Sequence, residues 1–305
     1  MSSIALFRRV SILTAVFAYL QIALGGVVRV SGSGLGCPDW PLCHGRPYPP
    51  ANLHAIIEYS HRTVGAITGV LVIVTVVAAW VVFRTRRPVV AWLATASLAA
   101  IAVEGALGGV VVVNELQPWL VAVHLGLAMI ILGGLIGAAV MSMPESPGVT
   151  NARLPRLAAI ATAATYVLLL SGSAVVATQA DESCNAWPLC GAGFTPDFGG
   201  VNAFTMLHRG LALAVGALLV YFLWLVIRDC APWARIFAAV SIVALLAQVA
   251  VGALSAFTDA ALVNGIHIAL ATLVWSAVLT TATLIAPRAD SADWHARFEM
   301  SQTAV

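Results

Sequence analysis

Long apolar runs separated by short polar segments make up most of this chain. The runs fall near residues 10–30, 62–83, 88–113, 119–143, 154–178, 207–227, 232–257 and 260–286. As a helix, each run is long enough to cross a hydrocarbon layer of about 30 Å. Open strands cannot satisfy their backbone groups in lipid, so the pattern predicts an all-α integral membrane protein with eight transmembrane helices in the bilayer.

The composition agrees with this class. Hydrophobic residues make up 61% of the 305 positions and charged residues only 9%, whereas soluble domains carry about 25% charged residues. Every basic residue is arginine, and no basic patch typical of nucleic-acid binding is present. The apolar run after Arg8 and Arg9 is too long for a signal-peptide core, so we expect a retained first helix.

The arginines predict the orientation in the membrane, because they favour the cytoplasmic side of short connections. Eleven fall on one side: Arg8, Arg9, Arg84, Arg86, Arg87, Arg153, Arg156, Arg228, Arg235, Arg288 and Arg297. The four on the other side are Arg29, Arg46, Arg62 and Arg209. We therefore expect a multi-pass cell (plasma) membrane protein with both termini in the cytoplasm. The long loops near 31–57 and 179–203 are then extracytoplasmic.

The two halves of the chain repeat each other. The matching positions are Cys37 to Cys43 with Cys184 to Cys190 and His61-Arg62 with His208-Arg209, both offset by 147, and His124 with His267, offset by 143. Four helices precede the repeat, so both halves have the same orientation. We predict two tandem four-helix bundles, residues 1–147 and 148–305, related by a parallel pseudo-two-fold axis and joined by a linker near 144–153.

Four histidines share this repeat, and ionisable groups inside a membrane are costly enough to indicate function. We expect His61 to face His124 and His208 to face His267 near the outer ends of their helices. Two facing histidines without a thiolate or carboxylate cluster suit the axial positions of a haem better than zinc, which needs more ligands. Polar packing or a proton relay is the alternative. The histidines expected to be ordinary polar residues are His44, His54 and His295.

The cysteines form two pairs of C-x5-C spacing in the outer loops, where disulfides persist. We expect the pairs Cys37–Cys43 and Cys184–Cys190 rather than a metal pair, because the loops offer no repeated partner ligands. Such small exposed rings are structural or redox-active, and the sequence leaves both open. Cys230 has no partner.

Two acids break the symmetry of the repeat. Glu58 precedes His61 by about one helical turn, so both side chains can face one cavity, and the matching residue in the second half is Thr205. A helix-start carboxylate and a proton-moving group beside a haem are the two interpretations. Glu104 lies well inside an apolar run and matches the neutral Gln248, which favours a hydrogen bond between helices.

Arg62 and Arg209 follow the repeated histidines directly. Arginine pairs with carboxylates such as haem propionates, although interfacial arginines also extend toward water without a specific partner. The glycine pairs at 25–26, 108–109 and 133–134 either let helices approach closely or leave room for a flat macrocycle.

Together these features resemble the haem A synthase family of bacteria and mitochondria, over nearly the whole chain. The resemblance rests on eight helices in two halves, the Glu-x-x-His-Arg sequence at 58–62, the three later histidines and the Gly-x-Gly-x-x-Cys-Pro-Asp-Trp-Pro-Leu-Cys run at 32–43. Glu104 departs from the pattern, because the analogy with Gln248 leads us to expect glutamine there.

The resemblance implies a membrane oxidoreductase that converts haem O to haem A, by successive hydroxylations of a porphyrin methyl group to a formyl group. It implies that the second half holds haem b as a redox cofactor through His208 and His267, and that the first half holds haem O near His61 and His124. Glu58 is then catalytic, and the Cys37–Cys43 pair assists electron or haem transfer. A haem O synthase is the expected upstream partner, haem-copper oxidases receive the product, and the electron donor or acceptor is unidentified.

Two other classes compete with this interpretation. A di-haem b electron carrier would use all four histidines as permanent ligands, but it needs neither an unmatched Glu58 nor cysteine loops. A transporter built from two repeats would place polar residues at mid-membrane. Apart from Glu104 and Gln248, the polar residues here gather at the outer ends.

Overall fold

The computed structural model describes residues 3–144, 151–184, 186–191, 195–258 and 260–286. Eight helices in these ranges are long and apolar enough to cross a membrane, which confirms the predicted all-α membrane class. They are α1 (Ser3–Val30), α2 (Leu53–Phe83), α3 (Pro88–Val113), α4 (Pro118–Met141), α5 (Leu154–Ala177), α7 (Asn202–Asp229), α8 (Pro232–Phe257) and α9 (Ala261–Ile285). A short helix that hydropathy did not predict, α6 (Ala180–Ser183), precedes α7.

Part of the predicted chain lies outside the described residues. This applies to most of the linker near 144–153 and to Arg288, His295 and Arg297.

Local sequence explains where the helices begin. Proline stands in the first turn of α3, α4, α5 and α8, where its fixed φ suits a helix and its missing N–H is not needed. Asn52 caps α2, and its side-chain oxygen accepts hydrogen bonds from the backbone N–H of His54 (2.9 Å) and of Ala55 (3.3 Å). Helix α2 therefore starts well before residue 62, and Glu58 and His61 both lie on it.

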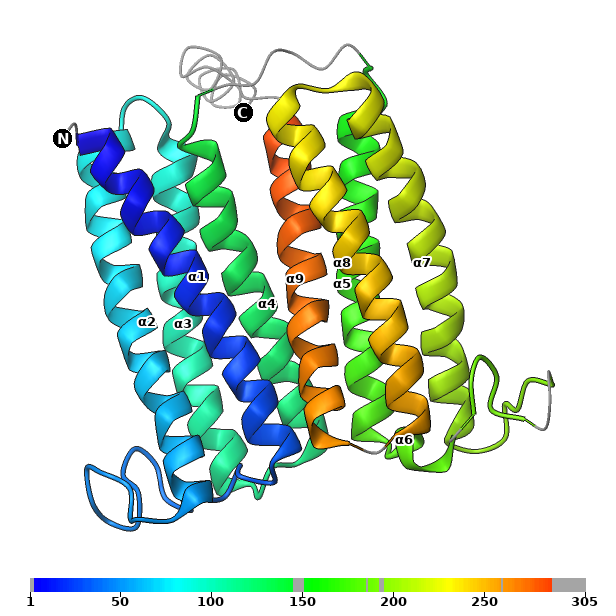
Figure 1. Cartoon of the computed structure of the whole chain (residues 1–305). Helices are drawn as coiled ribbons and strands as arrows, with labels where there is room; N and C mark the ends of the chain where they lie inside the picture. Colours follow the sequence, from blue (N-terminus) through cyan, green and yellow to red (C-terminus); the bar gives the residue numbers. More distant parts are fainter. Residues whose placement is uncertain (1–2, 145–150, 185, 192–194, 259, 287–305) are drawn as a thin grey trace, which may run out of the picture.

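Each half of the chain packs as a closed group of four long helices (Figure 1). In the first half, α1 contacts α2 and α4, and α3 completes the ring between them. In the second half, α5 contacts α7 and α9, and α8 lies between those two. The halves meet where α1 and α4 pack against α9 and where α4 packs against α5.

Side chains of one half bond the backbone of the other along this contact, which we call the seam. The Tyr19 hydroxyl donates to the Ala269 carbonyl (3.2 Å), and the Tyr166 hydroxyl donates to the Gly126 carbonyl (3.1 Å). The indole N–H of the buried Trp275 donates to the Met129 carbonyl at 3.0 Å. Tyr19 and Tyr166 are offset by 147, so the seam uses the same repeat position twice.

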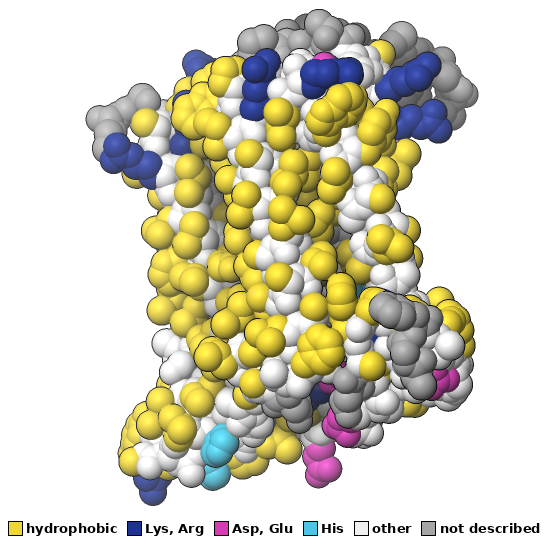
Figure 2. Space-filling view, turned by 45° about the vertical axis from the view of Figure 1, so that its right-hand side comes forward, with side chains coloured by type: hydrophobic (Ala, Val, Ile, Leu, Met, Phe, Trp, Pro, Cys, Tyr) yellow, Lys and Arg dark blue, Asp and Glu magenta, His cyan; other side chains and the backbone are white. Residues whose placement is uncertain are grey.

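Charged side chains separate by end on the outside of the molecule. Figure 2 shows an apolar belt along the helices, with most basic side chains of this face gathered at the end where α1 begins. Most of its acidic and histidine side chains lie at the other end. This distribution fits a chain that crosses a bilayer eight times.

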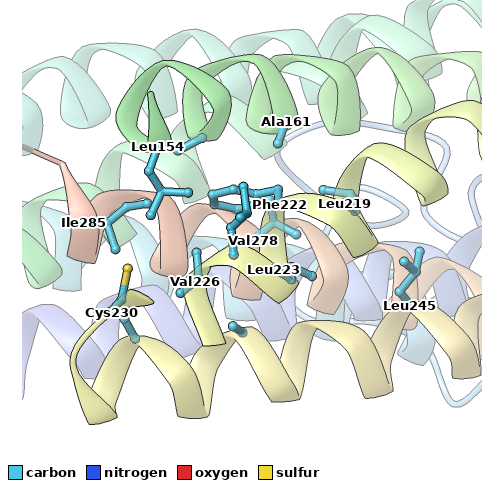
Figure 3. Close-up of a cluster of buried hydrophobic side chains, with 14 of the residues drawn as sticks. Leu154, Ala161, Leu219, Phe222, Leu223, Val226, Cys230, Leu245, Val278 and Ile285 are labelled. Carbon is cyan, nitrogen blue, oxygen red and sulfur yellow. The ribbon is translucent and has the colours of Figure 1, made fainter. Parts of the chain in front are cut away.

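Tight apolar packing fills the arginine-rich end of each half, and a further cluster that includes Met129, Leu132 and Trp275 fills the middle of the first half and its contact with α9. In the second half the packing at the arginine-rich end joins Leu154, Leu219, Phe222, Val226 and Val278, from three helices (Figure 3). In the first half, Phe7 and Phe83 meet edge to face at 4.9 Å between ring centroids. Near the opposite end, the buried apolar cluster around the first loop contains only Cys37, Cys43 and Ala55. The polar residues singled out by the sequence therefore lie near the less densely packed end.

Candidate haem-binding site

The four repeated histidines occupy equivalent places in the two bundles. His61, His124, His208 and His267 lie within about two turns of the starts of α2, α4, α7 and α9. All four side chains are half-buried. His61 lies within electrostatic range of His124, and His208 lies within range of His267. The structure thus brings the histidines together in the predicted pairs, one pair in each half.

Every one of these rings packs against a glycine on a neighbouring helix. A Cβ built on the glycine would lie 3.1 Å from His61 Cε1 at Gly25 and 3.2 Å from His208 Cε1 at Gly172. The corresponding distances are 3.4 Å from His124 at Gly108 and 2.7 Å from His267 at Gly252. At Gly252 even a methyl group would displace the ring. We call these four positions the glycine seats. Gly25 and Gly108 thus make room for an imidazole of the neighbouring helix, and a role in leaving space for a macrocycle stays a prediction.

Each ring also has a polar neighbour at one of its nitrogens. His208 Nδ1 is 2.7 Å from Ser171 Oγ, and His124 Nδ1 is 3.0 Å from Glu104 Oε1. The side-chain nitrogens of Gln21 and Gln248 lie 3.3 Å from Nε2 of His61 and Nε2 of His267, respectively. The repeat of histidines and cysteines does not predict Gln21 or Ser171 as their neighbours. Gln21 could have been found, because it is a lone amide in an apolar run.

The other nitrogen of each ring remains for a ligand. Nδ1 of His61 and Nδ1 of His267 are buried and have no hydrogen-bond partner in the part of the chain that the structure describes. No hydrogen bond from a described residue reaches Nε2 of His124 or of His208. Paired imidazoles that each have a polar neighbour at one nitrogen and no hydrogen bond from a described residue at the other fit the axial positions of a haem iron. No group of three or more metal-ligating side chains accompanies them among the described residues, as tetrahedral zinc would need.

Glu58 lies beneath the first cysteine loop and is only 3% exposed. Its Oε2 accepts a hydrogen bond from the backbone N–H of Cys37 at 2.8 Å, and its Oε1 pairs with the guanidinium of Arg62. Both contacts favour the ionised carboxylate. The matching Thr205 makes a different bond, from its hydroxyl to the Ala180 carbonyl at 3.0 Å. The carboxylate near the first histidine pair therefore has no counterpart in the second half.

Arg62 binds the loop itself, an arrangement that we call the arginine latch. Its guanidinium donates to the carbonyls of Asp39 (2.7 Å), Leu42 (2.7 Å) and Cys37 (2.8 Å). Arg209 does the same in the second half, donating to the carbonyls of Ala186 (2.7 Å) and Pro188 (3.1 Å). Asp39 and Ala186 are themselves repeat equivalents. The contact with a haem propionate stays a prediction for both arginines, since loop carbonyls already accept their hydrogen bonds.

The cysteines form the two expected disulfides. Cys37 bonds Cys43 and Cys184 bonds Cys190, and both cysteines of the first pair are fully buried. Directly after the second cysteine of this pair, backbone N–H groups of Gly45 and His44 donate to the carboxylate of Asp39 and hold the pKa of that group below its ordinary value. The first loop is thus closed by a covalent ring, an internal turn and the arginine latch.

His44 lies in this loop, and His54 lies in the first turn of α2 beside it. His44 Nε2 lies 3.0 Å from the Gly36 carbonyl oxygen, and His54 Nδ1 lies 3.0 Å from Ser33 Oγ. Both border an open cavity of about 720 Å³ at the mouth of the first bundle. Each ring therefore contacts the loop and stands apart from the four repeated histidines.

Comparison with known proteins agrees with this arrangement. Residues 8–279 match the family described as cytochrome oxidase assembly protein, COX15-CtaA. A protein of Shouchella clausii named heme A synthase is 30% identical over 230 residues, which cover 72% of this chain and 76% of the relative. The chain belongs to the haem A synthase family. A second member, heme A synthase of Listeria monocytogenes serotype 4a, is 27% identical over 297 residues, or 92% of this chain and 95% of that protein. Family membership therefore extends over both bundles.

Proposed function

We propose that this member of the haem A synthase family oxidises a methyl group of haem O to the formyl group of haem A. The observation that carries the proposal is the pair of histidines in each bundle, seated on glycine at the same end of the membrane. The names of the relatives agree with it. Two successive hydroxylations would turn the methyl group into a geminal diol, and loss of water would leave the formyl group.

We assign different porphyrins to the two halves. The half at residues 1–147 binds the substrate haem O between His61 and His124, and the half at residues 148–305 binds haem b between His208 and His267. The asymmetry of the acids supports this assignment, because Glu58 and Glu104 stand beside the first pair and Thr205 and Gln248 take their places beside the second. When bound, haem b supplies the electron-transfer chemistry that no side chain provides.

The chain's own residues position the substrate and handle protons. Glu58 is nearly excluded from water, lies about one turn from His61 and is bonded by Arg62 and by the backbone N–H of Cys37. A carboxylate in that place can hold or move a proton at its Oε atoms while the methyl group reacts. The first cysteine loop covers Glu58, and we propose that its buried Cys37–Cys43 disulfide assists electron or haem transfer.

The orientation of the protein in the membrane and its partners follow from the same reasoning. The protein is a multi-pass membrane protein, and we propose that the arginine-rich end faces the cytoplasm, which leaves the disulfide loops outside the cell membrane. A haem O synthase would supply the substrate, and a separate electron donor or acceptor would complete the reaction.

The test is extraction and chromatography of haems from cells that make this protein together with a haem O synthase. We expect haem A to be present with the chain and absent without it. If haem b copurifies with the folded protein while haem O stays unconverted, the protein is a di-haem electron carrier and the proposed function is wrong.

A further inference from the structure

Glu104 on α3 and Gln248 on α8 are repeat equivalents that treat their histidines differently. Glu104 Oε1 lies 3.0 Å from His124 Nδ1, at ion-pair distance but without the alignment of a hydrogen bond. Gln248 presents its side-chain nitrogen 3.3 Å from the other ring nitrogen, Nε2, of His267. The two polar side chains thus lie at different ring nitrogens, Glu104 at Nδ1 and Gln248 at Nε2, and one is a carboxyl group while the other is an amide.

Within the part of the chain that the structure describes, Glu104 lacks the hydrogen-bond partners that a buried acid with a purely structural role would have. Its side chain is 12% exposed, and its second oxygen, Oε2, is buried without a hydrogen-bond partner among the described residues. In the same residues, the ion pairs give Glu104 no partner other than His124. An acid inside a membrane helix is costly, and a neutral amide fills the equivalent place in the second half. The carboxyl group therefore needs a purpose beyond joining two helices.

A carboxyl group beside the non-ligating nitrogen of a histidine has a known physical effect. It accepts the ring N–H, fixes the tautomer and the ring direction, and makes the other nitrogen a stronger metal ligand. At His124 that other nitrogen is Nε2, which no described hydrogen bond reaches. Gly108, one turn further along α3, leaves His124 less crowded than the other glycine seats leave their rings, since a Cβ built there would lie 3.4 Å from His124 Cε1.

We infer that Glu104 is a positioning residue for His124, which holds Nδ1 so that Nε2 becomes a strong ligand to the substrate haem iron. The inference rests on the proposed function, because it assumes that the first half binds haem O. The same inference predicts that the two haem sites differ in the oxidation state that they favour. The haem held by His124 should favour the ferric state more than the haem held by His267, whose neighbour Gln248 is neutral.

Reciprocal substitutions test this inference. Glu104→Gln gives the first half the residue of the second, and Gln248→Glu does the opposite. The purified full-length protein is titrated with ferric haem O without reductant, so that no turnover occurs. We expect Glu104→Gln to weaken haem O binding about ten- to a hundredfold. It should also change the low-spin ferric electron paramagnetic resonance signal and raise the midpoint potential of the bound haem O. Gln248→Glu should lower the midpoint potential of haem b.

The outcomes separate this inference from the proposed function. Haem b in the second half reports folding of each variant. If Glu104→Gln keeps haem b and binds haem O with unchanged affinity, signal and potential, the inference is overturned and the proposed function stands. If the wild-type protein keeps haem b but binds no haem O, both are overturned. If Glu104→Gln does not fold, Gln248→Glu decides, and an unchanged haem b potential overturns the inference.

Discussion

The four glycine seats lie directly against the rings of the four repeated histidines. A glycine has no Cβ, so the imidazole of the next helix can rest almost on the backbone. The fit differs along the repeat, from 2.7 Å for the missing methyl group of Gly252 to 3.4 Å for that of Gly108. Because protein interiors are close-packed, a difference of this size decides whether a methyl group is tolerated. The seats are therefore shape determinants of the histidine pairs, with unequal tolerance.

Gly252→Ala tests the tightest seat. The new methyl group should push His267 from its place, at a cost of about 1–3 kcal/mol, and the protein should lose most of its haem b. Gly108→Ala is the matched control, since its methyl group meets His124 at an ordinary contact distance. The measurement is haem b content per protein together with thermal stability. Equal haem b in the two variants would show that the seats do not position the rings.

Glu58 combines two roles at one residue, and its substitution must separate them. Glu58→Gln removes the charge opposite Arg62 and places an amide N–H₂ among donors. We expect haem O still to bind through His61 and His124 while formyl production stops, as measured by haem chromatography.

Thiol labelling of the first cysteine loop is the control for Glu58→Gln. If the cysteines of Glu58→Gln are as protected from labelling as those of the wild type, the activity is lost because the carboxylate is missing and not because the loop has opened. Normal haem A production by Glu58→Gln would remove Glu58 from the reaction.

At the scale of the elements, the arginine latch ties each cysteine loop to the helix that follows it. Arg62 lies on α2 and Arg209 on α7, and both reach back over about twenty residues to loop carbonyls. Only the first half adds the carboxylate of Glu58 beneath its latch. The first loop is consequently bonded by a buried carboxylate, whereas in the second loop the described bonds include one from the backbone N–H of Cys190 to the sulfur of Met206.

Arg62→Ala should release the first loop. Carbonyls of Cys37, Asp39 and Leu42 would lose their donor, and the buried Glu58 would lose its cation, which is strongly destabilising for a buried pair. The Cys37–Cys43 disulfide should then be reduced faster by a mild thiol, as followed by labelling of the new cysteines. Arg46→Ala, which removes a charge from the same loop but keeps the latch, should behave like the wild type. Equal reduction rates in all three proteins would contradict the latch.

The sequence predicts the elements well and their contacts poorly. Apolar runs and the repeat predict the eight helices, the histidine pairs and both disulfides, because each leaves a mark in residue type and spacing. Helix α2 starts earlier than its apolar run predicts, because its first two turns contain the exposed His54 and Ser60 and the buried Glu58, which interrupt the apolar pattern. The latch was missed because its acceptors are backbone carbonyls, which no residue type reveals. Ser171 was missed because a serine in a membrane helix usually bonds only its own backbone.

At the scale of the whole molecule, tight packing and polar chemistry lie at opposite ends. Both bundles pack their large apolar side chains toward the arginine-rich end, where Phe222 and Phe7 are fully buried. The histidine pairs and the disulfides lie toward the other end, which is the lower one in Figure 1. Dense packing at one end can keep the helices in register, while the other end leaves room for a flat ligand and its insertion.

The seam has a consequence for how the protein can be assembled. Its donors, Tyr19, Tyr166 and Trp275, all bond backbone carbonyls of the other half, and each half closes its own ring of helices. Two separate polypeptides, 1–144 and 151–305, should therefore find each other in the membrane and copurify when made in the same cell. Replacing the three donors by phenylalanine should abolish that complementation, while the same replacements in the unbroken chain should leave haem b in place. The covalent link between the two halves would then not be needed for assembly. The working protein could be regarded as a heterodimer whose two subunits are encoded as one chain.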